Sequence, residues 1–301
     1  MIFNRQTLKL VVLAASLGVI SGQSFAAGIE WSDTYLNIRN YWGNTEPGFE
    51  GTVPELAGNI SYANGWTYGS NFVSLDFENI GKPDGAVCCQ GAPGGKGTSA
   101  SFESYNVFRT TLSGNKISGT KNFAFGPVSD VGLELGGDVA TQDDQLGIYK
   151  RYIIVGPQFS FALPKGFWTA TIAVAHEWTT NSFQANNSVS FNTTYAIESA
   201  WLYPFNIGPV PLRFEGFLDF IGPKGTGGSG GFYHNAEFLL HPKLMVDVGD
   251  LIGYAPNKFV AGVGYEYWMN KFGTTPHGLA NQGTPGGSQQ NAIFIEAGYH
   301  F

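Results

Sequence analysis

The chain ends with Asn291-Ala-Ile-Phe-Ile-Glu-Ala-Gly-Tyr-His-Phe301, a stretch in which two kinds of side chain alternate. Successive side chains of a β-strand point to opposite faces. One face would carry the apolar set Ile293, Ile295, Tyr299 and Phe301. The other face would carry Phe294, Glu296, Gly298 and His300. A strand that alternates in this way and ends on an aromatic residue is typical of the closing strand of a membrane β-barrel, although a half-buried strand of a soluble protein shows the same alternation.

The beginning of the chain has the features of an export signal. Arg5 and Lys9 precede an apolar run over 10–20, and Ser24-Phe25-Ala26 follows the small-x-small pattern of a cleavage site. The run is shorter than the roughly 20 apolar residues that a membrane-spanning helix needs. We therefore predict a signal peptide over 1–26 and a single domain over 27–301, which is secreted, periplasmic or in the outer membrane.

The composition favours the outer membrane. Aromatic residues make up 15% of the chain and glycine occupies 42 positions. Charged residues make up only 13%, against about 25% in an ordinary soluble domain. This balance suits a protein with a lipid-facing belt and tight turns, whereas a secreted β-sandwich would usually carry more surface charge. The formal net charge of −7 argues against nucleic acid as a partner, because such binding relies on clustered Lys and Arg.

Strand-like segments alternate along the chain with short turns and longer polar loops. Twelve segments are predicted, over 33–42, 58–63, 68–78, 101–112, 128–140, 150–162, 167–178, 188–203, 211–222, 232–248, 258–270 and 290–301. An even number suits a closed antiparallel barrel, and the long connectors 43–57, 79–100 and 271–289 fall at odd, extracellular positions. The tenth segment contains Pro242, which cannot donate to the ladder, so we expect a bulge or a strand end there.

Each predicted strand has one apolar face and one ionic face. In the first, Leu36 and Ile38 oppose Asn37 and Arg39. A charged side chain costs about 2–4 kcal/mol at the lipid-facing midplane of a barrel, so the ionic face must line the lumen. The fold prediction is an all-β, twelve-stranded antiparallel transmembrane barrel of the outer membrane.

The predicted lumen combines aromatic rings with charges of both signs, acids being in the majority. Its candidate substrate-binding residues are Tyr35, Arg39, Phe72, Asp76, Glu103, Tyr105, Arg109, Arg213, Glu215, Phe217, Glu266 and Trp268. Rings offer flat apolar faces to a planar solute, while charged groups can hydrogen-bond its polar edge. This combination predicts a selective pore for a nucleobase or a sugar. The other interpretation is that ion pairs among these residues simply fill the lumen.

Several motifs make the sequence resemble a known family. They are Trp31-Ser-Asp33, Gly65-Trp-Thr-Tyr-Gly-Ser-Asn-Phe72 leading to Asp76, Tyr105-Asn-Val-Phe-Arg-Thr-Thr-Leu112, Gly156-Pro157, Gly222-Pro-Lys-Gly225, Gly264-Tyr-Glu-Tyr-Trp-Met-Asn-Lys-Phe-Gly273 and Tyr299-His-Phe301. In these stretches the chain is similar to the Tsx-like nucleoside-specific channel-forming outer-membrane proteins, a family that includes the OmpK phage receptors.

The resemblance implies a monomeric barrel in outer-membrane lipid that passes nucleosides and deoxynucleosides by passive diffusion. It also implies surface loops that can serve as a receptor for a phage or a colicin. Of the candidate lumen residues, Phe72, Asp76, Arg109 and Glu266 fall within or next to the matching motifs. The stretch Ala86-Val-Cys-Cys-Gln90 departs from the family pattern. The alternative function is a closed or weakly conducting barrel that acts as a surface receptor or adhesin.

The sequence gives little sign of catalysis or of metal binding. An outer-membrane lipase or protease would need a nucleophile and a base near the rim, where the candidates are His176-Glu177 and Asp143-Asp144. We interpret these as solvated rim charges and predict no enzyme and no cofactor. Gly91–Gly97 lacks the spacing of a phosphate loop, and the adjacent Cys88 and Cys89 cannot staple distant elements. No metal is predicted, because metal-ligand spacing is absent among His176, His234, His241, His277 and His300.

Overall fold

A computed structural model describes residues 28–47, 51–81, 101–143, 148–180, 188–227, 233–274 and 287–301. The predicted signal peptide lies outside the described residues, as do Cys88, Cys89, Gly91–Gly97, Asp144 and His277. The rest of the chain forms one closed β-barrel.

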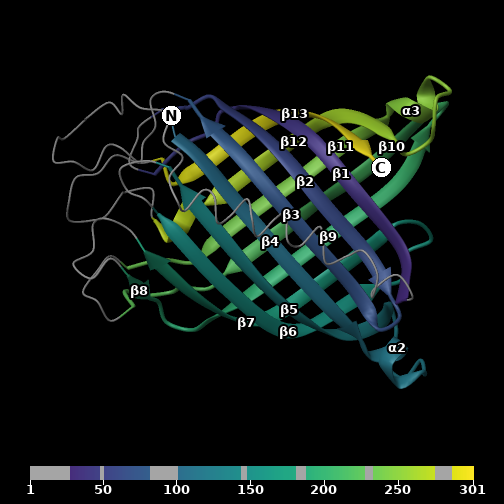
Figure 1. Ribbon diagram of the computed structural model, residues 1–301, viewed down its shortest axis with the longest axis horizontal. Coiled ribbons are helices and arrows are strands. Elements are labelled where there is room, and N and C mark those ends of the chain that lie inside the picture. The colour runs from purple at the N-terminus through teal and green to yellow at the C-terminus, as the bar shows by residue number, and fades with distance from the viewer. Residues whose placement is uncertain are drawn as a thin grey trace.

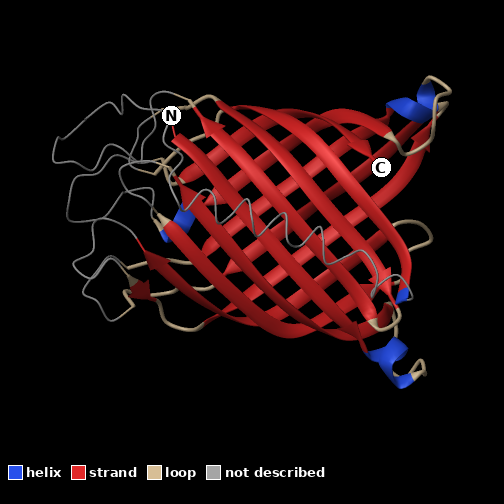
Figure 2. Cartoon of the chain, in the orientation of Figure 1, coloured by secondary structure: helices blue, strands red, loops and turns tan. Residues whose placement is uncertain are grey.

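Twelve long antiparallel strands make the barrel wall (Figures 1 and 2). They are β1 Ile29–Trp42, β2 Glu55–Trp66, β3 Gly69–Ile80, β4 Ser101–Ser113, β5 Val128–Gln142, β6 Tyr149–Phe161, β7 Phe167–Thr180, β9 Thr194–Ile207, β10 Val210–Ile221, β11 Glu237–Asp247, β12 Phe259–Met269 and β13 Gln289–His300. Each strand pairs with the next, and β13 pairs with β1 to close the barrel. The two-residue strand β8, Val189–Ser190, pairs with β7 at its end.

The twelve predicted strands are all present, with changed ends. The second is longer than predicted, because the ladder continues through Asn64 and Gly65 to the pair Trp66↔Gly69. The eighth begins at Thr194 rather than at 188, since residues 189–190 form the separate strand β8. The tenth begins at Glu237 rather than at 232. In each case strand pairing, rather than local composition, sets the boundary.

The expected bulge or strand end at Pro242 was wrong. Pro242 lies opposite Gly216 in an unshifted β10–β11 register. On the β12 side, the pairs Leu240↔Tyr267 and Lys243↔Gly264 share one register. The strand therefore runs straight through the proline, because one missing N–H donor interrupts the ladder locally without displacing it.

The two ends of the barrel differ. One end carries the tight turns, the chain's C-terminus and the short helices α2 (Gly114–Ser118) and α3 (Val248–Leu251), and the other carries β8 and the 3₁₀ turn η3 (Lys271–Gly273) (Figure 1). Outer-membrane barrels have short periplasmic turns and longer extracellular loops. We therefore call the first end periplasmic and the second extracellular. Within the described ranges, none of the helices has the length and apolar character needed to cross a membrane.

The outer wall exposes a belt of large apolar side chains. The exposed fraction is 53% for Ile38, 55% for Ile172, 56% for Val174 and 58% for Ile293. Such a belt suits lipid rather than water, so the predicted assignment of faces is confirmed. Leu212 belongs to the same face but is only 9% exposed, and its strand β10 is the one against which α3 packs.

Gly264 gives a direct test of packing inside the wall. A Cβ atom at this position would overlap the ring of Phe294, which lies over the glycine from β13. We expect Gly264→Ala to lower the free energy of unfolding by about 1–3 kcal/mol, the usual effect of overpacking. Urea unfolding of the refolded barrel measures this. The control is Gly58→Ala, where the nearest atom would be 3.9 Å away; equal losses in the two variants would contradict the packing argument.

Candidate functional site

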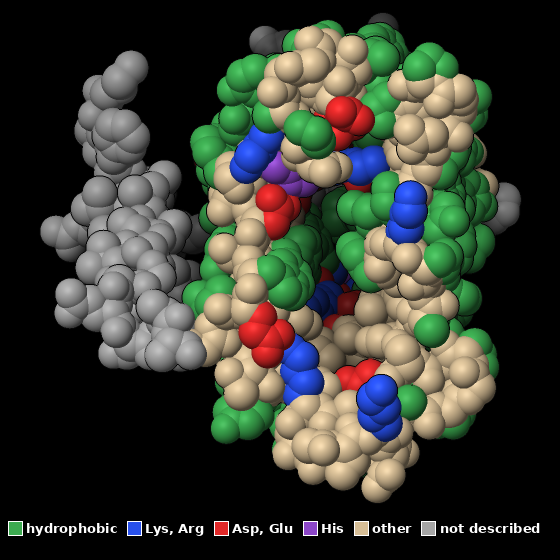
Figure 3. Space-filling view, turned by 90° about the vertical axis from the view of Figure 1, so that its right-hand side faces the viewer, with side chains coloured by type: hydrophobic (Ala, Val, Ile, Leu, Met, Phe, Trp, Pro, Cys, Tyr) green, Lys and Arg blue, Asp and Glu red, His purple; other side chains and the backbone are tan. Residues whose placement is uncertain are grey.

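The strand registers place the twelve candidate residues on the inner face of the barrel, opposite the apolar belt. The barrel is hollowed at its periplasmic end (Figure 3). Acidic, basic and apolar side chains line that hollow. Cross-strand partners share a face, and Asp76↔Tyr105 and Phe72↔Arg109 are such pairs. Phe72 is 40% exposed, so part of its ring is open to the lumen.

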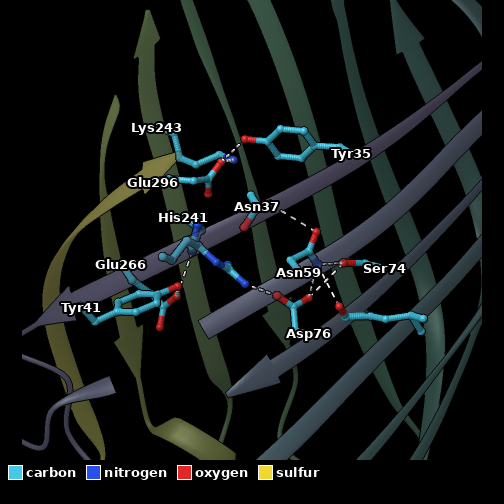
Figure 4. Close-up of polar contacts among 12 residues, drawn as sticks. Tyr35, Asn37, Tyr41, Asn59, Ser74, Asp76, His241, Lys243, Glu266 and Glu296 are labelled. Atoms are coloured by element: carbon cyan, nitrogen blue, oxygen red, sulfur yellow. Dashed lines mark hydrogen bonds and ion pairs between the residues drawn. The ribbon is translucent and has the colours of Figure 1, made fainter. Parts of the chain in front are cut away.

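One polar cluster is built by the first three strands (Figure 4). Arg39 of β1 forms an ion pair with Asp76 of β3. Between them, Asn59 of β2 donates to Asp76 over 2.9 Å and to Ser74 over 2.7 Å. Asn37 donates in turn to Asn59 over 3.3 Å. The alternation of β1 to β3 brings these groups together, because all of them occupy inward positions.

A second cluster joins the two ends of the chain. Glu296 of β13 accepts from the Tyr35 hydroxyl and from the Lys243 ammonium, both over 2.7 Å (Figure 4). Lys243 also lies 3.1 Å from Glu215, and Arg213 lies 3.2 Å from the same carboxylate. The charges alternate along this chain of contacts, so each cation is held by an acid.

A ladder of rings follows the wall beside these clusters. Phe217 stacks on His241 with 4.9 Å between ring centroids and a 12° interplanar angle. His241 contacts Phe294 at 4.6 Å, and Phe294 contacts Tyr41 at 4.9 Å. His241 Nδ1 lies 2.8 Å from Glu266 Oε2. The sequence reasoning missed His241, Phe294 and Tyr41 as parts of this site, although Phe294 was placed on the inner face.

Arg109 connects two parts of the wall that are distant in the sheet. It contacts Asp138 over 2.6 Å and both oxygens of Glu198, over 2.7 and 2.8 Å. Three strands, β5 to β7, separate β4 from β9 in the sheet, so this contact reaches across part of the lumen. Tyr105 donates to Asp138 over 2.9 Å and accepts from Lys150 over 3.0 Å.

The remaining candidates lie toward the extracellular end. Glu103 is the cross-strand partner of Glu78. The Trp268 ring contacts Phe272 and the Lys271 ammonium, which lies 5.1 Å from the ring centroid.

Two buried lysines link the extracellular connectors to the barrel wall or to one another. The Lys224 ammonium lies 2.7 Å from Glu177 and 2.5 Å from Glu237. The Lys271 ammonium lies 2.7 Å from Glu46. Burial alone would lower the pKa of Lys271, but the carboxylates of Glu46, Glu55 and Glu103 together outweigh burial and hold this pKa above its usual range. Both lysines therefore hold connectors of the outer mouth through short contacts with carboxylates.

The predicted rim candidates separate in the structure. Glu177 points inward to Lys224, whereas His176 points outward to the hydroxyls of Thr193 and Ser190. Adjacent side chains of a strand face opposite ways, so His176 and Glu177 cannot act on one substrate. Among the described residues, no group of three or more His, Cys, Asp or Glu side chains could hold a metal ion.

Comparisons with known proteins find likeness in structure but not in sequence. No protein-family model and no curated protein matches the chain. The NanC porin structure has a TM-score of 0.42 at 10% identity, with 88% of this chain and 98% of that chain covered. The translocator domain of the autotransporter NalP from Neisseria meningitidis has a TM-score of 0.41 at 9% identity, with 98% and 95% covered. The KdgM porin has a TM-score of 0.39 at 9% identity, with 89% and 99% covered. Likeness at this level does not identify a family, so membership of the nucleoside-channel family stays a prediction.

Proposed function

We propose that the protein is an outer-membrane channel through which nucleosides and deoxynucleosides diffuse passively. The observation that carries this proposal is the make-up of the lumen, in which aromatic faces lie beside basic groups that carboxylates already hold. A nucleoside is uncharged and has a flat base and several polar edges. Rings such as Phe72 and Phe217 would contact the base, and the fixed polar groups would contact the edges of the base and ribose.

The ion pairs of the basic lumen residues favour the passage of an uncharged solute. Arg39, Arg109 and Lys243 are each held by a carboxylate, so none of them offers an uncompensated charge to a strongly ionic solute. The N–H groups of these three side chains that are not used in the ion pairs can still donate hydrogen bonds to a solute, and the barrel wall fixes their positions. A channel site must bind well enough to admit solute and weakly enough to release it, and such paired groups suit weak, staged binding.

Single-channel conductance in a planar bilayer tests the proposal. The mature protein is inserted and the current is recorded while adenosine or thymidine is added. We expect block that increases with nucleoside concentration and that free sugars and amino acids do not produce. An open pore that is indifferent to nucleosides would overturn the proposed solute.

A closed barrel that serves as a surface receptor is the second candidate. The contact of Arg109 with Glu198 favours it, because this contact bridges non-adjacent strands and narrows the lumen. Absence of any conductance in the same bilayer experiment would support this candidate and exclude the channel.

Phe72 gives a residue-level prediction. Its ring is 40% exposed on the inner face, and stacking of a base on an aromatic ring contributes about 1–3 kcal/mol. We expect Phe72→Ala to raise the nucleoside concentration needed for half-block by roughly tenfold or more while the barrel stays folded. The control is Phe77→Ala on the outer face of the same strand, where the ring is 37% exposed. Similar effects in both variants would remove Phe72 from the solute path.

A further inference from the structure

Three side chains on the outer surface form a chain of hydrogen bonds near the extracellular end. His176 Nε2 lies 3.0 Å from the Ser190 hydroxyl oxygen, and His176 Nδ1 lies 3.0 Å from the Thr193 hydroxyl oxygen. These contacts are exposed to the surroundings of the barrel. None of the three residues takes part in the lumen clusters.

The fold brings these side chains together from separate segments. His176 lies near the end of β7, and Ser190 is the second residue of β8, which pairs with β7 through Trp178↔Ser190. Thr193 directly precedes β9. The backbone N–H of Phe191 donates to the Glu177 carbonyl over 3.0 Å, which fixes the connector next to the histidine. The ring of Trp178 packs against His176 with 4.3 Å between centroids.

The arrangement has the order of a nucleophile, a base and a group that orients the base. With the proton on Nδ1, the imidazole donates to Thr193 and its Nε2 is free to accept from Ser190. A serine hydroxyl is a weak nucleophile until an adjacent base takes its proton. A third group that holds the other ring nitrogen keeps the imidazole in the required tautomer.

The position of the serine indicates the substrate class. Val174 and Ile172 follow His176 toward the middle of the same outer face and are 56% and 55% exposed. Ile153, opposite His176 on β6, is 52% exposed. An acyl chain can lie along these apolar side chains, with its ester group at the boundary with water, beside Ser190. We propose that Ser190, His176 and Thr193 form an acyl-transfer site that hydrolyses carboxylic esters of lipids at the extracellular face of the membrane.

The reaction balances with water as the only co-substrate. The Ser190 oxygen attacks the ester carbonyl carbon while His176 Nε2 takes the hydroxyl proton. The bond from carbon to the leaving oxygen breaks, and the proton passes from His176 to the departing alcohol. Water then attacks the acyl carbon while His176 takes a proton from it. The bond from this carbon to the Ser190 oxygen breaks, His176 returns the proton to that oxygen, and the fatty acid leaves. Thr193 is a positioning residue, since it contacts the imidazole and not the ester.

Labelling with a fluorophosphonate probe tests the nucleophile. The refolded full-length mature barrel in detergent micelles is incubated with the probe and separated on a gel. We expect covalent labelling of the wild type, no labelling of Ser190→Ala, and labelling slowed by about a hundredfold or more in His176→Gln. The matched control is Ser199→Ala, because Ser199 is an outer-face serine that hydrogen-bonds Trp168 and the Thr169 carbonyl rather than a histidine. No labelling of the wild type, or equal labelling of Ser190→Ala, would overturn the proposal.

Fatty-acid release from mixed micelles of a diacyl phosphatidylethanolamine tests the substrate. We expect release by the wild type that Ser190→Ala abolishes, and an unchanged single-channel conductance in that variant. Thr193→Val should slow both release and labelling, and Thr193→Ser should restore them, because a serine hydroxyl can still accept from Nδ1. Labelling at Ser190 without release of fatty acid would overturn the assignment to lipid esters. None of these outcomes depends on whether the lumen passes nucleosides.

Discussion

Arg109→Ala is expected to widen the lumen and to destabilise the barrel. Among the described residues, the Arg109 guanidinium is the one cation that forms an ion pair with Glu198. It also lies 2.6 Å from the Asp138 carboxylate. The side chains of Arg109, Asp138 and Glu198 are 12%, 6% and 14% exposed. Removing one partner of a buried ion pair leaves uncompensated charge, which typically lowers the free energy of unfolding by about 3–5 kcal/mol. The lost contact across the lumen should also raise single-channel conductance and weaken nucleoside block.

Two variants separate these effects. In Arg109→Met combined with Asp138→Asn and Glu198→Gln, no unpaired charge remains, so we expect much of the stability to return while nucleoside block stays weak. Arg151→Ala is the matched control on the outer face, where the guanidinium lies 5.4 Å from the centroid of the Tyr149 ring. Unchanged conductance and unchanged urea midpoint in Arg109→Ala would show that this ion pair neither narrows nor stabilises the barrel.

The fold follows from the sequence because one physical rule acts on every strand. Lipid outside and polar groups inside impose a period of two on each segment, and β13 shows this period plainly, with Ile293 and Ile295 outside and Phe294 and Glu296 inside. Local composition does not predict the exposure of a side chain where another element packs against its strand. Leu212 has the position of a lipid-facing residue but is only 9% exposed, on the strand against which α3 packs, and no strand pattern predicts which helix folds over which strand.

The lumen could be predicted only as a set of inward residues. Parity places Arg109 inside, but its partner Glu198 is 89 positions away in the sequence, and the contact depends on barrel closure and on the reach of both side chains. His241 was missed for a related reason, because the neighbouring Pro242 made the course of its strand uncertain. The chain of contacts from Ser190 to Thr193 was also missed, since it depends on how β8 returns to β7, which the alternation of side chains does not encode.

Lys224→Met is expected to loosen the extracellular mouth. The Lys224 side chain is 2% exposed, and its carboxylate partners Glu177 and Glu237 are 5% and 4% exposed. The ammonium thus neutralises two buried acids, one on β7 and one on β11, and its loss should lower the free energy of unfolding by about 3–5 kcal/mol. The backbone of Lys224 also accepts from Asn192 over 3.0 Å and donates to His234 over 3.0 Å. When the side chain no longer holds this connector, we expect faster current fluctuations and faster proteolysis at the extracellular end.

The control for this prediction must remove the charge imbalance without restoring the link between β7 and β11. The control variant combines Lys224→Met with Glu177→Gln and Glu237→Gln, so that no buried carboxylate is left without its cation. We expect its free energy of unfolding to recover only in part, because Lys150 loses its contact with Glu177 at 3.7 Å. The connector should nevertheless stay loose, since no ammonium joins β7 to β11. Lys165→Met, at an exposed position in the turn between β6 and β7, should change neither property. Wild-type current fluctuations and wild-type proteolysis in Lys224→Met would mean that backbone hydrogen bonds alone hold the outer mouth in place.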